Sequence, residues 1–365
     1  MPRRSQRNLR PWTGTMTALA AIAVCLGLAG CGANTKPAPS PPPPPSPLGH
    51  AYVTTPNNLF AYAITASDGT LTSIATPSGA PGGTAVTSNG TKNVVYTVTS
   101  GGQISGYSLN RSDGSLTAIS GSPWGGAGSG VAFLVADGAG QNLYVPAVQD
   151  LTVVPFGIGA NGALTIGLQV STPAAPVSAT VDPQGHFLYV PMGNTGTELF
   201  QITNGALVDA GTIPPLGTGG ALFMAITPAD TFAYITDGVS GVAGYSVNSS
   251  TGALTALPGS PFPAGQGAGV LAMSPNGKFL YVANATGLAP FSINADGSLT
   301  AIGTPLTLPT PATFMTIEFT GTYLYALTVN SQLVFIYKID STSGQLTSEP
   351  SGSAPFVPNG ITTTP

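Results

Sequence analysis

A tyrosine within a short apolar stretch recurs seven times along the chain, at intervals of 44, 48, 45, 45, 47 and 44 residues. The seven residues are Tyr52, Tyr96, Tyr144, Tyr189, Tyr234, Tyr281 and Tyr325. A period of this length is typical of repeat architectures, in which each repeat forms one small structural unit beside its neighbours. The rest of the sequence must therefore be read one repeat at a time.

Two further markers follow the tyrosine in every repeat. The first is an aromatic residue, found at Tyr62, Tyr107, Phe156, Phe200, Tyr245, Phe291 and Tyr337. The second is a leucine after a glycine-containing turn, found at Leu71, Leu116, Leu164, Leu207, Leu254, Leu299 and Leu346. Asp-Gly, Asn-Gly or Ser-Gly precedes this leucine in most repeats. These dipeptides indicate β-hairpins because their residues tolerate positive φ angles.

One repeat shows four short β-strands clearly. They are predicted over 271–274, 279–282, 289–293 and 298–302, with turns at 275–278 and 294–297. Four strands in about 45 residues are typical of one blade of a β-propeller. Residues 49–365 are therefore predicted to form an all-β, seven-bladed propeller of four-stranded blades.

The two ends of the repeat region indicate how the ring closes. In later repeats an apolar strand lies about ten residues before the tyrosine, but the corresponding place in the first repeat is Pro42, within a proline tract. Residues 361–365 match the pattern of 271–275 and have no strands after them. We expect this C-terminal strand to complete the first blade, which removes two open sheet edges.

The strand and turn motifs resemble those of the lactonase-like seven-bladed propellers, which include bacterial 6-phosphogluconolactonase and carboxymuconate-lactonizing enzymes. The pattern is also similar to that of related extracytoplasmic propeller-repeat proteins without an assigned reaction. The motifs are Phe279-Leu-Tyr-Val-Ala-Asn284, Ser274-Pro-Asn-Gly277, Thr251-Gly-Ala-Leu-Thr255, Gly259-Ser-Pro-Phe262 and Gly121-Ser-Pro-Trp124. Because they build strands and turns, the resemblance implies the fold more strongly than an activity.

The N-terminal segment has the features of a targeting signal. Residues 1–30 combine a basic start with a short apolar run, as in a secretory signal peptide. The ending Leu28-Ala29-Gly30-Cys31 resembles a bacterial lipobox, which predicts lipidation at Cys31. Residues 31–48 carry the lipidated cysteine and a proline-rich spacer that favours polyproline II. We expect a lipid-anchored, extracytoplasmic protein of the cell envelope, with Gly32 favouring the outer membrane.

Composition excludes several classes of function. Only 6% of the residues are charged. From residue 31 onward five Lys and Arg remain against thirteen Asp and Glu. Nucleic-acid binding requires clustered cations and is excluded. With Cys25 in the signal and Cys31 lipidated, no thiol remains for catalysis or a disulfide. Membrane contact is expected through the lipid alone, and the propeller is expected to be a monomer.

Candidate site residues come from the loops that lead into the innermost strands and from the turns between second and third strands, which share one rim. Asp150, Glu198 and Asp237 come from successive repeats and could converge for acid–base work or around a divalent cation. They could equally be solvated loop acids. Trp124 and Asn284 are weaker candidates for ligand binding, and Trp124 could instead replace the phenylalanine of the Gly-Ser-Pro-Phe motif in packing. No cofactor or metal is predicted.

His50 and His186, the only histidines, are not placed for general base catalysis. His50 takes the strand position of Phe279 in another repeat, and His186 falls on the opposite rim. The lone arginine of the mature chain, Arg111, also lies in a hairpin on that rim. Anionic lactones require such donors, so they are not expected as substrates. The sequence favours a binding or scaffolding module for a neutral ligand, a glycan or a protein partner. The alternative is a lactonase-type hydrolase that acts on a lactone ring.

Overall fold

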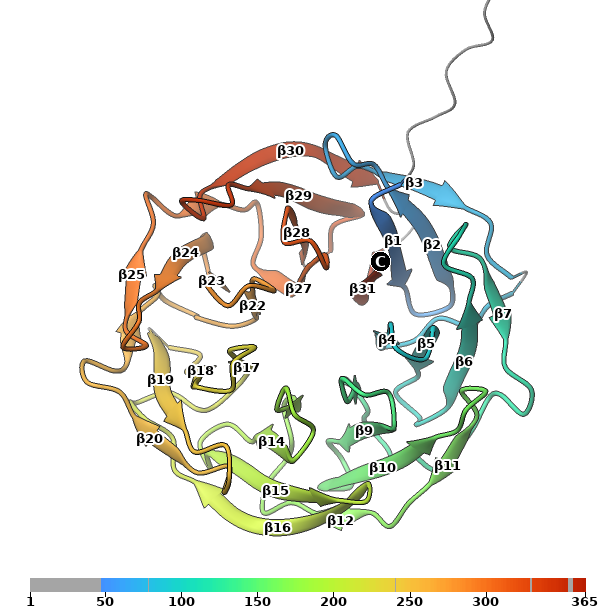
Figure 1. The fold of residues 1–365 in the computed structure, drawn as a ribbon, viewed down its shortest axis with the longest axis horizontal. Coiled ribbons are helices and arrows are strands. Elements are labelled where there is room, and N and C mark those ends of the chain that lie inside the picture. The colour runs from blue at the N-terminus through green and yellow to red at the C-terminus, as the bar shows by residue number, and fades with distance from the viewer. Residues whose placement is uncertain (1–46, 78, 240, 329, 354–356) are drawn as a thin grey trace, which may run out of the picture. The chain divides into compact units, whose positions relative to one another are not determined.

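The computed structural model describes residues 47–365 except 78, 240, 329 and 354–356. Within these residues all regular structure is β-strand, arranged as seven sheets around a ring (Figure 1). The predicted seven-bladed all-β propeller is therefore confirmed. No helix in the described part has the length and hydropathy needed to cross a membrane. The predicted signal peptide of residues 1–30, the predicted lipidation site Cys31 and nearly all of the predicted spacer lie outside the described residues.

Each blade is an antiparallel sheet of four strands, counted outward from the centre. In blade order, the innermost strands are β31 (Gly360–Thr364), β4 (Ala85–Asn89), β8 (Val135–Ala136), β13 (Thr180–Val181), β17 (Met224–Ile226), β22 (Leu271–Met273) and β27 (Ala312–Ile317). The second strands are β1 (Gly49–Thr54), β5 (Val94–Val98), β9 (Asn142–Ala147), β14 (Phe187–Pro191), β18 (Phe232–Thr236), β23 (Phe279–Ala283) and β28 (Tyr323–Thr328).

The outer half of each blade shows more variation. The third strands are β2 (Leu59–Ile64), β6 (Ile104–Leu109), β10 (Thr152–Ile158), β15 (Thr197–Thr203), β19 (Gly241–Val247), β24 (Gly287–Ile293) and β29 (Leu333–Ile339). The outermost strands are β3 (Leu71–Ile74), β7 (Leu116–Ala118), β11 (Leu164–Ile166), β16 (Ala206–Ile213), β20 (Leu254–Ala256), β25 (Leu299–Ala301) and β30 (Leu346–Ser353). In three blades the outermost strand breaks and resumes as β12 (Val170–Ser171), β21 (Phe262–Pro263) and β26 (Leu306–Thr307), which the sequence did not predict.

The ring closes through the C-terminal strand, as predicted. β31 pairs antiparallel with β1, from His50 opposite Thr364 to Thr54 opposite Gly360. Ile361 is 1% exposed and packs between the first and last blades. Closure therefore adds both a backbone ladder and a buried apolar side chain to the first blade.

The core consists of apolar layers between neighbouring blades. In one layer Ala51 and Val53 of the first blade pack against Tyr323, Tyr325 and Leu327 of the seventh. The antiparallel order of the strands defines two rims. The loop rim carries the loops that lead into the innermost strands and the turns between second and third strands. The hairpin rim carries the turns between first and second strands and between third and fourth strands.

The repeated tyrosine connects most blades to the next blade in the ring. Six of the seven hydroxyls donate a hydrogen bond of 2.7–2.9 Å to a glycine carbonyl in the hairpin between the third and fourth strands of the following blade. The pairs are Tyr52–Gly114, Tyr96–Gly162, Tyr189–Gly252, Tyr234–Gly297, Tyr281–Gly344 and Tyr325–Gly69. All six tyrosines are fully buried.

Glycine is required at the accepting position. Gly344 has φ of +72°, a region that favours glycine, and a Cβ there would lie 2.3 Å from the ring of Phe279. Gly297 repeats the arrangement, with φ of +83° and a clash at 2.5 Å with Phe232. In these two pairs the hairpin glycine thus lies flat on the aromatic residue two positions before the tyrosine that bonds it.

Tyr144 is the exception. Its hydroxyl is buried and has no hydrogen-bond partner among the described residues. The hairpin that follows in the next blade has only two residues, Asn204 and Gly205, between Thr203 and Ala206. In the other blades five or six residues separate the paired ends. The shorter hairpin explains why no carbonyl reaches the tyrosine.

Deletion of residues 358–365 should destabilise the protein strongly. It removes β31, its ladder with β1 and the buried Ile361. We expect the melting temperature to fall by roughly 5–10 °C, since each kcal/mol lost lowers it by a few degrees. Calorimetry of the truncated and intact proteins measures this, and a peptide of residues 358–365 added in trans should restore part of the loss. An unchanged melting curve would contradict closure by β31.

Tyr281→Phe should lower the free energy of unfolding by about 1–2 kcal/mol, because the buried carbonyl of Gly344 loses its donor. Tyr144→Phe is the matched control. It removes a hydroxyl of the same repeat position without a described partner, so we expect a change near zero. Urea denaturation in the presence of a metal chelator compares the two variants, so that the described protein contacts alone decide the result. Equal losses would show that the hydroxyl bonds do not hold neighbouring blades together.

Candidate functional site

The innermost strands line the central channel, and several hydroxyl groups in these strands or just before them donate to backbone carbonyls of the next blade. Thr84 Oγ1 donates to the carbonyl of Val131 at 2.7 Å, and Ser178 Oγ donates to that of Leu222 at 2.6 Å. Thr180 Oγ1 donates to the carbonyl of Met224 at 2.9 Å. These carbonyls lie at the inner edge of each sheet, where no further strand can pair with them. These hydroxyls therefore hold neighbouring blades together, and their protons are not free for a ligand.

An apolar cavity of about 90 Å³ opens among the innermost strands of blades three to seven. Phe133, Phe223 and Phe314 line it from alternate blades, each at the same repeat position. The rings of Phe133 and Phe314 lie 6.5 Å apart between centroids. Met224 and Met315 fill the space behind them. This position lies near the start of each innermost strand, so the aromatic rings form an apolar floor below the loop rim.

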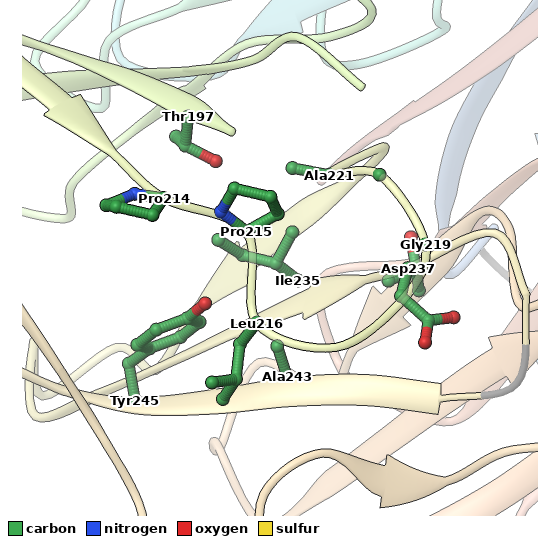
Figure 2. Close-up of a pocket in the computed structure, with 12 residues that line it drawn as sticks. Thr197, Pro214, Pro215, Leu216, Gly219, Ala221, Ile235, Asp237, Ala243 and Tyr245 are labelled. Atoms are coloured by element: carbon green, nitrogen blue, oxygen red, sulfur yellow. The ribbon is translucent and has the colours of Figure 1, made fainter. Parts of the chain in front are cut away.

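A smaller pocket on the loop rim lies between blades four and five (Figure 2). Figure 2 shows Pro214, Pro215 and Leu216 over Ile235, with Asp237 beside Gly219 at the other end. Its volume of about 10 Å³ holds about one water molecule. This pocket is too small for a substrate.

Asp237 and Asn284 occupy one repeat position, three residues after the repeated tyrosine, and both hold a turn. Asp237 Oδ1 accepts hydrogen bonds from the amides of Val239 and Gly241 at 2.9 and 2.8 Å. Asn284 Oδ1 accepts from the amide of Gly287 at 2.9 Å, and its Nδ2 donates to the carbonyl of Ala264 at 2.8 Å. Both side chains are buried. Turn formation accounts for these two residues without a ligand.

Glu198 lies inside blade four rather than at the rim surface. The side chain is 2% exposed and accepts a hydrogen bond from the Thr212 hydroxyl at 2.5 Å. Burial raises the pKa of this carboxyl, and the nearby charge of Asp209 raises the pKa further. A β-bulge between Glu198 and Phe200, opposite β16, accompanies this inward placement. Glu198 cannot reach a ligand in this arrangement.

Asp150 differs from the other two acids because its side chain is exposed. Its Oδ2 accepts a 2.8 Å hydrogen bond from the amide of Ser129, in the loop that leads to the innermost strand of the same blade. Gly128 makes this contact possible. A Cβ there would lie 2.9 Å from Asp150 Oδ2, and the φ of +85° favours glycine. Each of the three predicted acids is thus engaged within its own blade, and Asp150 alone among them faces solvent.

Trp124 is half-buried and packs over Gly106, where a Cβ would lie 2.6 Å from the indole. Phe262 packs over Gly244 in the same way in another blade. The tryptophan therefore replaces the phenylalanine of the repeated motif in packing, which was one of the two alternatives.

The two histidines lie on the hairpin rim. His50 is 2% exposed, and a Cβ on Gly114 would contact its ring. Burial lowers the pKa of His50. His186 is exposed and follows the turn after β13.

The four cations of the described residues, Lys92, Arg111, Lys278 and Lys338, lie in or beside turns of that same rim. Arg111 donates to Asn93 Oδ1 and to the carbonyl of Gly90. No group of three or more His, Cys, Asp or Glu side chains among the residues of known placement could hold a metal ion.

The fold and the channel thus define a closed seven-bladed propeller with an apolar channel floor and a loop rim without cations in the described residues. Residues 64–356 match the family model described as lactonase, 7-bladed beta-propeller. Because this match covers most of the chain, the protein belongs to the lactonase family of seven-bladed β-propellers.

Similar proteins of known name point in the same direction. The chain is 30% identical over 190 residues to 6-phosphogluconolactonase of Yersinia pestis, which covers 47% of this chain and 55% of that one. It is 28% identical over 205 residues to the Serratia proteamaculans enzyme of the same name, which covers 52% and 61%. The matched stretch thus spans little more than half the length of these relatives.

Solved structures agree in fold. A Bacteroides fragilis protein assigned provisionally as a 6-phosphogluconolactonase has a TM-score of 0.76 at 18% identity, covering 88% of this chain and 99% of that one. A periplasmic gluconolactonase of Pseudomonas aeruginosa has a TM-score of 0.71 at 18% identity, covering 86% and 98%.

The prediction of a binding or scaffolding module is therefore wrong. The family model and the named relatives favour the alternative, a lactonase. The prediction weighed the scarcity of cationic and nucleophilic side chains too heavily. Water is the nucleophile in lactone hydrolysis, so the chemistry requires neither a catalytic cysteine nor a serine.

Glu198→Gln should stabilise the protein at pH 8 by a few degrees in melting temperature. Because the pKa of Glu198 is raised in the folded state, its favourable contribution is complete below its unfolded pKa and is lost as the pH rises through the folded pKa. Glutamine avoids this loss and keeps an acceptor for Thr212. Thermal melts from pH 4 to pH 8 should show the gap closing at acidic pH. A gap independent of pH would argue against a buried, ionised Glu198.

Proposed function

We propose that this propeller hydrolyses a lactone on its loop rim. The observation that carries the proposal is membership of the lactonase family over residues 64–356. The similarity to 6-phosphogluconolactonases over about half of the chain supports the same reaction class. In this reaction water adds to the ester carbonyl, the bond to the ring oxygen breaks, and that oxygen takes up a proton. The product is an open-chain hydroxy acid.

Asp150 is the side chain best suited to accept the proton from the attacking water. Its carboxylate is exposed on the loop rim, and the amide of Ser129 holds one oxygen in place. The other oxygen is then directed by that anchor and can bond a water molecule. Glu198 and Asp237 are buried and bonded within their own blade, so they contribute to positioning the rim.

The substrate we propose is a lactone without a phosphate or carboxylate. All four cations in the described residues lie on the hairpin rim, so an anionic substituent at the loop rim would lack a charged donor. The apolar floor formed by Phe133, Phe223 and Phe314 suits an uncharged ring or a short alkyl substituent. This distinguishes the expected specificity from that named for the relatives.

For location, we propose a lipid anchor at Cys31 that holds the propeller on the outer face of a membrane of the cell envelope. The proposal rests on the lipobox-like ending of residues 28–31 and the proline-rich spacer that follows. A spacer of some seventeen residues in polyproline II reaches roughly 50 Å, which leaves the loop rim open to small diffusible substrates.

The test is a pH-stat assay of the purified protein against neutral γ- and δ-lactones, glucono-δ-lactone and 6-phosphogluconolactone. We expect turnover of a neutral lactone, and a loss of about 10²–10⁴ in kcat for Asp150→Asn. Asp296→Asn, an exposed acid in a turn of the hairpin rim, is the control and should be fully active.

The outcomes separate the claims. No turnover above the spontaneous rate for any lactone contradicts the proposed function. A fully active Asp150→Asn variant contradicts only the role of Asp150. Preference for the phosphorylated lactone contradicts the proposed substrate class.

A further inference from the structure

Two acidic side chains are buried at the junction of blades four and five on the hairpin rim. Asp182 follows β13 and is 1% exposed, and Asp230 lies in the turn between β17 and β18 and is 3% exposed. Three of their four carboxylate oxygens have no hydrogen-bond partner among the described residues: Asp182 Oδ2 and both oxygens of Asp230. Buried carboxylates without compensation are strongly unfavourable, so a positive charge or a proton must accompany them.

The turn that holds Asp182 does not require an acid. Asp182 Oδ1 accepts the amides of His186 and Phe187 at 2.6 and 2.7 Å. In the next blade Thr227 Oγ1 accepts the corresponding amides at 3.1 and 3.0 Å. A neutral hydroxyl therefore suffices to hold the turn. The turn uses only Oδ1 of Asp182, and the second carboxylate oxygen has no part in it.

The turn that holds Asp230 does not require an acid either. Its φ is +55°, within the left-handed region. Glycine occupies the same turn position in four other blades, at Gly140, Gly185, Gly277 and Gly321, with φ of 66–76°. An aspartate here accepts both backbone strain and the desolvation of its charge. The unfavourable backbone conformation and the buried charge together indicate that this side chain has a role that glycine cannot fill.

Two other blades indicate where the Asp230 side chain lies relative to Asp182. A Cβ on Gly140 would lie 2.5 Å from Oδ1 of Asn89, the residue of the preceding blade that corresponds to Asp182. A Cβ on Gly277 would lie 2.8 Å from Pro228, which corresponds to Pro183. Burial raises the pKa of Asp230, the charge of Asp182 raises it further, and His186 opposes both. From the analogous turns and from the influence of the Asp182 charge on Asp230, we infer that the two carboxylates lie close together across the junction.

A third polar group lies close by. The Tyr144 hydroxyl extends from blade three toward blade four, is buried and has no partner among the described residues. Burial raises its pKa, and the charges of Asp137 and Asp182 add to this, so the hydroxyl lies within electrostatic reach of Asp182. The hydroxyl is thus a buried donor without an acceptor in the electrostatic neighbourhood of acceptors without a donor, and an ion with its bound water would satisfy both.

We propose that a calcium ion binds at this junction, with Asp182 Oδ2 and the two oxygens of Asp230 as its protein ligands. The available donors are all oxygen, which suits a hard cation, and the pair supplies the matching charge of −2. Calcium also accepts backbone carbonyls and water in a flexible coordination shell, so it does not need a third acidic residue. Water within reach of the Tyr144 hydroxyl completes the surroundings.

The first experiment measures the melting temperature of the purified protein in about 5 mM CaCl₂, to saturate the site, and in about 5 mM EGTA, to remove calcium. We expect calcium to raise the melting temperature by about 3 °C or more. Asp230→Gly should abolish the rise, and because glycine is native to this turn elsewhere, the variant should fold and be more stable than the wild type in EGTA. Asp182→Asn retains Oδ1 for the turn and should also lose the response.

The second experiment uses Tb³⁺, a calcium substitute whose luminescence is sensitised by nearby tyrosine. The wild type should give a signal that CaCl₂ displaces, and Asp230→Gly should lose most of it. Asp296→Asn, an exposed hairpin acid, is the matched control and should behave as the wild type. A calcium-dependent rise that persists in both Asp230→Gly and Asp182→Asn would overturn the assignment. So would a wild type that ignores calcium and is stabilised only by acidic pH, since the pair would then hold a proton.

Discussion

The hydrogen bond from the repeated tyrosine to the next blade's hairpin glycine is the contact on which the ring depends. At six of the seven junctions it fixes the position of one blade against the next. In five of the six bonded pairs an aromatic side chain two positions before the tyrosine packs against the same glycine, and in the sixth Val94 takes its place. One short segment of each repeat thus supplies a strand, a hydroxyl donor and a side chain that packs against the next hairpin. The sequence repeat therefore determines how each blade is placed against the next.

Most of the fold was predictable from the sequence because these contacts repeat. The tyrosines, the second aromatics and the hairpin leucines all lie where seven blades require them, and closure by residues 361–365 follows from a missing strand. The second segments of three outermost strands were missed, since strands of two residues carry no pattern of their own. The shortened hairpin at Asn204 and Gly205 was visible in the sequence, but its effect on Tyr144 depends on a contact between blades.

The candidate site was less predictable because burial decides it. Asp150, Glu198 and Asp237 look alike in sequence, yet Asp150 alone of the three is exposed. Aligning the repeats would have shown that Asp237 and Asn284 share a turn position with Thr55 and Thr99, whose hydroxyls also accept turn amides. The same alignment reveals Asp230 where other blades have glycine. The alternation of Phe133, Phe223 and Phe314 was also readable, but their common cavity required the closed ring.

The pairing of β31 with β1 also determines the order in which the blades can be completed. Six blades consist of strands that follow one another along the chain, so each can form as soon as its own segment is available. The first blade instead waits for the last strand. Until then the inner edge of β1 exposes backbone groups that could pair with another chain. Because the chain is synthesised from its N-terminus, it carries this exposed edge through most of its synthesis, and the edge requires protection until β31 is available.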